Sequence, residues 1–247
     1  MEEKNILITG ATGGIGNAIA EKMKGENHIL LLNYCQAENK KGNLEKGFGK
    51  ENKNTWFFKA DLTIEKEVER MMNEISKIGD VDIIIHCVSL PLERGELIQK
   101  GPADFQRHFD LQVKSLLGIL KRTIPQMKKN KFGRIITVIT EGVIGKPPSN
   151  LADYVTAKYA LLGFSKCLAV EYGKFNITCN SVSPGLTETA LTEDFPNKLK
   201  EIVAAQTPLG RICKKEDIAG VVKFLCSDEA GFINGENIAV NGGCLMR

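Results

Sequence analysis

The stretch that decides the fold is Asn5-Ile6-Leu7-Ile8-Thr9-Gly10-Ala11-Thr12-Gly13-Gly14-Ile15-Gly16, in which an apolar strand pattern runs directly into a glycine-rich turn and then a helical pattern. The spacing of Gly10, Gly14 and Gly16 lets the backbone come close to a pyrophosphate group. The N–H groups at the start of the following helix meet the negative charge of such a group. In this strand–turn–helix context the turn predicts dinucleotide binding.

Downstream of the turn, short apolar runs alternate with longer helical patterns to the end of the chain. The expected strands are Asn5–Thr9, His28–Asn33, Thr55–Lys59, Asp82–His86, Arg134–Ile139, Ile177–Val182 and Ile238–Val240. The expected helices are Ile15–Met23, Ile64–Ile78, Ala103–Lys129, Ala152–Phe175 and Glu216–Leu225. Continuous apolar strands between helices predict an α/β, Rossmann-type doubly wound fold with a mostly parallel, seven-stranded sheet.

The length of 247 residues fits a single domain spanning 1–247. Two stretches break the alternation. Residues 36–54 are polar and rich in Lys, Asn and Gly, and are expected to form a poorly specified crossover. Gly185–Leu209 contains two prolines and lacks a strand pattern, so a helical or mobile substrate flap is expected at about 186–209.

Composition excludes several functional classes. The net charge of +3, spread along the chain, gives no case for nucleic acid as the main partner. The seven cysteines form no C-x-x-C pair and the three histidines are scattered, so no metal site is predicted. No signal peptide and no membrane-spanning apolar stretch is recognised. A cytoplasmic protein with reduced, mostly buried thiols is therefore expected.

Tyr154 and Lys158 stand four residues apart within an expected helix, so the two side chains share a face. A nearby cation favours phenolate over phenol, and we expect it to pull the tyrosine pKa down from about 10. Such a tyrosine can exchange a proton beside a bound nicotinamide.

The second expected strand ends at Asn33-Tyr34 with no acidic residue. An Asp or Glu there would hold the ribose 2′-hydroxyl of NAD and repel a 2′-phosphate, so its absence favours NADP. Lys40 and Lys41 could reach that phosphate, or could be solvated charges. Asp61 follows the third strand, where it could meet the adenine edge or cap the next helix.

With these motifs in order, the sequence resembles the short-chain dehydrogenase/reductase family, and is closest in look to its β-ketoacyl carrier-protein reductases. The motifs are the glycine turn, Asp61, Tyr154 with Lys158, the run Asn180–Gly185 with Thr189, and the tail Val240-Asn241-Gly242-Gly243. The likeness to the β-ketoacyl carrier-protein reductases rests on Asn33-Tyr34 and on Gly133-Arg134-Ile135-Ile136. Together these motifs cover nearly the whole chain.

The resemblance implies a role for each matching residue. Tyr154 would give a proton to the carbonyl oxygen as hydride arrives from the nicotinamide, and Lys158 would hold the nicotinamide ribose and depress the Tyr154 pKa. Thr140 stands where the family usually has serine, with Glu141 there instead if the register slips by one. The implied catalytic set is Tyr154, Lys158, Thr140 and Gln112. The implied cofactor contacts are Gly10, Thr12, Gly14, Ile15, Gly16, Asn33, Tyr34, Asp61, Leu62, Cys87, Tyr154, Lys158, Pro184, Gly185, Thr187 and Thr189, with Val182 behind the ring.

Three positions depart from the family pattern. The usual Asn-Asn-Ala-Gly after the fourth strand is His86-Cys87-Val88-Ser89, which bears on the fit of the adenosine ribose. Gln112 replaces the asparagine of the proton relay, and its extra methylene changes how a relay water is held. The basic residue that many NADP-using relatives carry in the glycine turn is replaced by Gly13.

These features predict an NADP-dependent reductase that transfers hydride to a ketone, of ketoacyl or related type. Two alternatives stay open: a low-turnover dinucleotide-binding partner or sensor protein, and a secondary-alcohol dehydrogenase working in the oxidative direction. The resemblance also implies a homotetramer and a small-molecule or carrier-bound substrate. Apolar residues Leu161, Leu162, Phe164 and Leu168 surround more than one helix face, which is consistent with burial in an interface as well as in the core.

Overall fold

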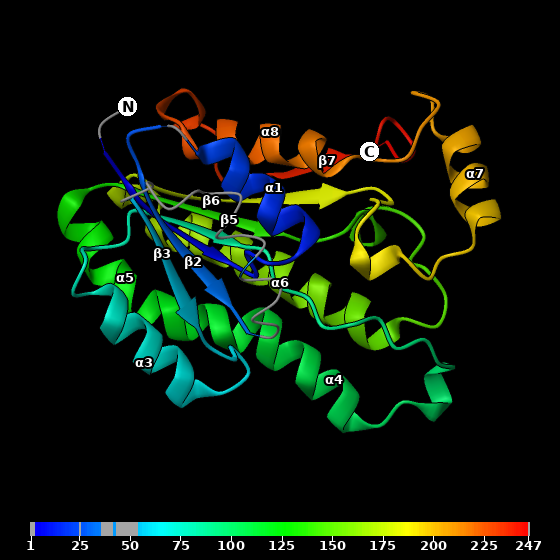
Figure 1. Cartoon of the computed structure of the whole chain (residues 1–247), viewed down its shortest axis with the longest axis horizontal. Helices are drawn as coiled ribbons and strands as arrows, with labels where there is room; N and C mark the ends of the chain where they lie inside the picture. Colours follow the sequence, from blue (N-terminus) through cyan, green and yellow to red (C-terminus); the bar gives the residue numbers. More distant parts are fainter. Residues whose placement is uncertain (1–2, 25, 36–41, 43–53, 247) are drawn as a thin grey trace.

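The fold is built on one seven-stranded sheet whose strands are all parallel (Figure 1). The computed structural model describes residues 3–24, 26–35, 42 and 54–246. The strands follow the order β3-β2-β1-β4-β5-β6-β7. Their bounds are β1 Asn5–Thr9, β2 Ile29–Tyr34, β3 Thr55–Lys59, β4 Ile83–His86, β5 Gly133–Val138, β6 Ile177–Pro184 and β7 Asn237–Val240. The predicted Rossmann-type sheet is confirmed.

Helices cover both faces of this sheet (Figure 1). Their bounds are α1 Gly14–Met23, α3 Glu65–Ile75, α4 Pro102–Phe109, α5 Ser115–Asn130, α6 Ala152–Tyr172, α7 Asn197–Gln206 and α8 Lys215–Cys226. Helices α1 and α8 lie together over one face, while α3, α5 and α6 cover the other. Right-handed crossovers between parallel strands produce this double covering.

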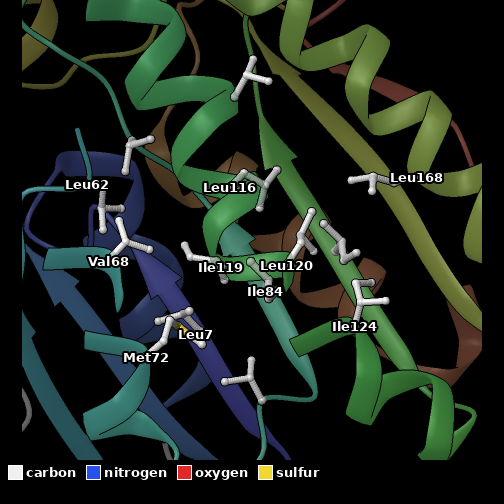
Figure 2. Packing of buried hydrophobic residues seen from close by; sticks show 14 of the residues in the cluster. Leu7, Leu62, Val68, Met72, Ile84, Leu116, Ile119, Leu120, Ile124 and Leu168 are labelled. Carbon is white, nitrogen blue, oxygen red and sulfur yellow. The ribbon is translucent and has the colours of Figure 1, made fainter. Parts of the chain in front are cut away.

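The central strands are apolar on both sides because each side meets a layer of helices. In β1, Leu7 belongs to the core under α3, α5 and α6, whereas Ile6 and Ile8 belong to the core under α1 and α8. In β4, Ile84 shares the first of these cores with Leu7 (Figure 2). Burial of this kind contributes about 1.5–3 kcal/mol for each large side chain.

One expected helix is interrupted. The sequence predicts one helix over Ala103–Lys129, but the structure has α4, a π-helical turn at Asp110–Lys114 and then α5. The π-turn leaves Gln112 completely buried. Turns of this type often occur at functional sites.

The two irregular stretches have different outcomes. Of residues 36–54, the structure describes only 42 and 54, so the expected polar crossover lies almost wholly outside the described residues. The expected flap contains a short 3₁₀ helix at Ala190–Thr192 and α7, and its described elements are helical. The flap begins at the carboxyl end of β6, beside the ends of the other central strands.

Gly10 is the position where the turn after β1 depends most on glycine. Its φ is +68°, in the left-handed region, and a Cβ there would collide with the backbone carbonyl of Cys87. We therefore expect Gly10→Ala to lower the free energy of unfolding by about 2 kcal/mol or more, measured by urea denaturation.

The matched control is Gly220→Ala in α8, where a Cβ meets nothing within 4 Å. That substitution should stabilise the protein by about 0.5–1 kcal/mol, because alanine favours helix. Equal effects of the two substitutions would contradict the assignment of a strained turn at Gly10.

Candidate active site

The glycine-rich turn after β1 lies next to the first residues of the flap. A Cβ added at Gly14 would come within 2.8 Å of Thr189 Cγ2. The N-terminus of α1 has no side-chain cap, and its first turn contains no acidic residue. The cradle at Gly14 and the helix end without a carboxylate both fit a phosphate group of a dinucleotide. Thr12 and Ile15 are half-buried in the same turn, and Gly16 packs against Gly10.

Asn33, near the end of β2, links the ends of β1 and β3 through hydrogen bonds. Its Oδ1 accepts a hydrogen bond from Gly10 N at 3.4 Å, and its Nδ2 donates to Ala60 O at 3.2 Å and to Phe58 O at 3.4 Å. Tyr34 is buried at the end of β2. Lys40 and Lys41 lie outside the described residues, so the expected contact of these lysines with a 2′-phosphate is untested.

Asp61 and Leu62 follow β3 and serve the packing of the next helix. Asp61 Oδ1 accepts hydrogen bonds from Thr63 N at 2.9 Å and from Thr63 Oγ1 at 2.7 Å. The N-cap residue of α3 is Ile64 and the helix has no side-chain cap, so Asp61 closes the preceding turn and does not cap the helix as the sequence alternative expected. The side chain of Leu62 lies in the hydrophobic core (Figure 2). Because Asp61 Oδ1 is engaged by Thr63 and the Leu62 side chain is buried, an adenine could be contacted here only by Asp61 Oδ2 or by the backbone.

The predicted catalytic hydroxyls lie together. The Tyr154 phenol, on α6, lies beside the Thr140 side chain, which follows β5. Thr140 Oγ1 accepts from Gly142 N at 3.3 Å, so its own proton is available to the phenol oxygen. The residue reached by counting from Gly133-Arg134, Thr140, therefore lies beside Tyr154.

Lys158 lies behind the phenol and is almost fully buried. Its Nζ donates to Val138 O at 2.8 Å, to Gln112 Oε1 at 3.0 Å and to Val88 O at 3.5 Å. Burial lowers the pKa of Lys158 to about 8. The sequence-predicted group Tyr154, Thr140, Lys158 and Gln112 is thus assembled in one place.

The expected depression of the Tyr154 pKa is wrong for this structure. Burial raises the pKa of Tyr154 to about 12, and the neighbouring Thr140 side chain opposes this rise only in part. The Lys158 Nζ is 5.8 Å from the phenol ring centroid and directs its protons to Gln112 and Val138. Desolvation of the phenolate therefore exceeds the attraction of the cation.

The remaining predicted contacts lie at the carboxyl ends of β4 and β6. Burial raises the pKa of the Cys87 thiol to about 12, so this thiol is protonated. Pro184 ends β6, and Gly185 N donates to Val240 O at 2.9 Å. Thr187 Oγ1 donates to Gly185 O at 2.8 Å, which fixes the first turn of the flap.

Sequence reasoning missed a buried charged cluster beside Tyr154. Asp153 Oδ2 is 2.9 Å from Lys100 Nζ and 3.7 Å from His108 Nε2, and the His108 ring lies edge-on to the Tyr154 ring with centroids 6.0 Å apart. Lys100 also donates to Glu93 O at 2.6 Å, so it fastens the loop after β4 to the start of α6. No sequence spacing links these residues, and only the fold brings them together.

Glu141 follows Thr140 and was weighed from the sequence only as the replacement for Thr140 in a shifted register. Burial raises the pKa of its carboxyl group, and the nearby Asn241 side chain and Leu186 backbone oppose this rise. Its Oε2 is buried without a hydrogen-bond partner. Glu141 thereby connects the end of β5 to the start of the flap.

The described part of the chain contains no cluster of three or more His, Cys, Asp or Glu side chains that could hold a metal ion. Among the helices described, none has the length and apolar character needed to cross a membrane. All seven cysteines are unpaired.

Comparison with known proteins identifies the class. Residues 10–244 match a family model described as enoyl-(acyl carrier protein) reductase. The chain is 30% identical over 245 residues to the 3-oxoacyl-[acyl-carrier-protein] reductase FabG of Staphylococcus aureus, with 98% of each chain covered. The chain belongs to the short-chain dehydrogenase/reductase family, and it is an oxidoreductase of that family.

Two further comparisons agree. The chain is 34% identical over 247 residues to the FabG reductase of Rickettsia conorii, covering 98% of this chain and 97% of that protein. Its structure superposes on the 3-ketoacyl-(acyl-carrier-protein) reductase from Brucella melitensis complexed with NADH, with a TM-score of 0.88, 26% identity and 98% coverage of both chains. The predicted resemblance to ketoacyl reductases is confirmed as a family relationship.

The lowered pKa of Lys158 makes a prediction about stability. Between pH 8 and the ordinary lysine value of 10.5, the unfolded chain holds a proton that folded Lys158 has lost. Unfolding therefore takes up a proton, and the free energy of unfolding rises with pH across this window. At about 1.4 kcal/mol per pH unit, the wild type should gain about 3 kcal/mol relative to Lys158→Met.

Urea denaturation of both proteins from pH 7 to pH 10.5 measures this difference, because contributions of other titrating groups largely cancel between them. Parallel pH dependences of the two proteins would show that the ammonium is not desolvated as the structure indicates.

Proposed function

We propose that this protein reduces a ketone with hydride from NADPH, and that Tyr154 supplies the proton. The observation that carries the proposal is the Thr140 side chain beside the Tyr154 phenol, with the Lys158 ammonium behind them. Two neighbouring hydroxyls can both donate hydrogen bonds to the oxygen of one carbonyl group. The dinucleotide, when bound, supplies the hydride.

The protonation state of Tyr154 supports the reductive direction. With a pKa of about 12, the phenol holds its proton at neutral pH. Reduction needs this form, because an alkoxide generated by hydride addition is more basic than phenolate and takes the proton. Oxidation of an alcohol would first require removal of the proton from a buried phenol. Thr140 polarises the carbonyl and holds the phenol oxygen in place.

NADP is favoured over NAD by the absence of an acidic residue at the end of β2. Asn33 and Tyr34 occupy the last positions of that strand, and neither carries a negative charge. A carboxylate there would repel a 2′-phosphate, so its absence permits one.

The substrate is proposed to be a ketoacyl-type or related carbonyl compound, free or attached to a carrier. The flap at about 186–209 and the loop after β4 are suited to enclose it. The guanidinium of Arg94 in that loop lies 4.5 Å from the ring centroid of Phe195 in the flap. This cation–π contact joins the two segments, and Leu92 of the same loop packs against the cluster of Leu151, Tyr154 and Val155.

Tyr154→Phe is expected to reduce kcat by about a hundredfold or more, because the proton donor is lost while the ring remains. NADPH oxidation is followed with a panel of ketones that includes a β-ketoacyl thioester, and the assay is repeated with NADH. The matched control is Tyr159→Phe on the same helix, where the side chain is 47% exposed. That control should keep wild-type turnover.

Unchanged turnover in Tyr154→Phe would remove the phenol from the mechanism. Tight NADPH binding without turnover of any ketone in the wild type would favour the alternative of a dinucleotide-binding sensor.

We also propose a homotetramer, for a reason different from the one expected. Leu161 and Leu168 belong to the core of the subunit itself, and Leu162 and Phe164 pack against that core. On a different face of α6, Tyr159 and Val170 are 47% and 86% exposed, and Cys167 is also exposed. These positions recur at helical spacing and form a stripe of exposed side chains that also includes Lys166.

Light scattering should give about four times the 27.2 kDa of one chain. Val170→Glu places a charge in the stripe and should lower that mass. Ile64→Glu, at an exposed apolar position before α3, is the control and should leave it unchanged. A monomeric wild type would contradict the proposal. The expected cytoplasmic location stays a prediction.

A further inference from the structure

Two of the departures from the family pattern meet inside the protein. His86 ends β4, Gln112 lies on the π-helical turn, and both are completely buried. They are 26 residues apart in the sequence, and His86 Nε2 lies 3.1 Å from Gln112 O. Both residues also lie close to Lys158, whose ammonium contacts the Gln112 amide.

The protonation of His86 follows from its neighbours. A backbone carbonyl only accepts, so Nε2 carries the proton and donates to Gln112 O. Nδ1 then accepts from Thr9 Oγ1 at 3.1 Å, and Thr9 Oγ1 accepts from Cys87 N at 3.2 Å. Burial and the nearby Lys158 lower the pKa of His86 to about 3. His86 is thus a neutral, fixed donor.

The Gln112 amide has only one orientation that satisfies its contacts. Its Oε1 accepts from Lys158 Nζ at 3.0 Å, because an ammonium only donates, and its Nε2 donates to Val88 O at 2.9 Å. Val88 belongs to the same departing segment as His86. The backbone of Gln112 is thus held by His86, and its side chain is held between Val88 and Lys158.

We propose that His86 is a positioning residue for Lys158 and acts through Gln112. The two departures from the family pattern then work as one unit. His86 fixes the backbone of the π-helical turn, the turn aims the Gln112 amide, and the amide oxygen holds the ammonium beside Tyr154. The inference rests on the proposed function only for the catalytic importance of Lys158. The geometry itself can be tested in the protein without cofactor.

Two substitutions of His86 separate this role from simple packing. Glutamine can place its Nε2 where the histidine Nε2 lies, so His86→Gln keeps the donor to Gln112 O. Asparagine reproduces only the Nδ1 side of the ring, so His86→Asn keeps a partner for Thr9 and loses the donor to Gln112. Proteins labelled with carbon-13 lysine are titrated by NMR without cofactor, and the Lys158 signal is assigned from its absence in Lys158→Arg.

We expect His86→Gln to keep the Lys158 pKa near 8 and the kcat within about threefold of wild type. His86→Asn should lower the Lys158 pKa, because an acceptor for the ammonium is lost, and should reduce kcat about tenfold. The control is His28→Asn, another buried histidine, which contacts Lys4 and Glu26 away from Lys158 and should change neither quantity. Equal losses in His86→Gln and His86→Asn, or an unchanged Lys158 pKa in His86→Asn, would overturn the proposal.

Gln112→Met tests the same link from its other end, and does so even if His86→Asn does not fold. Methionine keeps the length of the side chain and removes the amide, so the Lys158 pKa should fall. In the double variant, His86→Asn should add nothing to this fall, since His86 acts through the amide. Additive effects, or an unchanged Lys158 pKa in Gln112→Met, would overturn the proposal. Failure of Tyr154→Phe to lose activity would leave this titration untouched, so the two proposals fail separately.

Discussion

The site depends on the burial of one ammonium group. Lys158 is 3% exposed, and a charge so removed from water needs several oxygen partners close by. Val138 O at the end of β5, Val88 O after β4 and the Gln112 amide on the π-helical turn supply them. These partners come from distant parts of the chain, so the ammonium can be accommodated only when the central strands and α6 are assembled.

The same enclosure determines the chemistry of Tyr154. Taken out of water, the phenol keeps its proton, and the neighbouring hydroxyl of Thr140 only moderates this tendency. The parallel sheet makes this arrangement possible, because the carboxyl ends of its strands all meet at one edge. There the glycine turn, Thr140 and the start of the flap converge around α6. Apolar layers pack on both faces of the sheet behind that edge. Figure 2 shows one of these layers.

Much of this could be predicted from the sequence. The alternation of apolar strands and helices predicts the parallel seven-stranded sheet, and the position of Thr140 follows from counting along β5. The π-helical turn was missed because the apolar spacing of Ala103–Lys129 continues through it without glycine, and the only proline lies further along, in α5. The predicted direction of the Tyr154 pKa shift was wrong. The sequence spacing shows that Lys158 is near, but does not show how completely both groups are desolvated. The cluster of Asp153 and Lys100 has no signature in spacing at all.

The hydrogen bond between His86 and Gln112 also affects how the divergence of this chain is measured. A comparison made position by position counts two independent mismatches there, although the molecule shows a single joined unit. Because His86 contacts Gln112, a change at one of these residues alters the surroundings of the other. Their distance from the family pattern is therefore better counted as one joint change than as two separate ones.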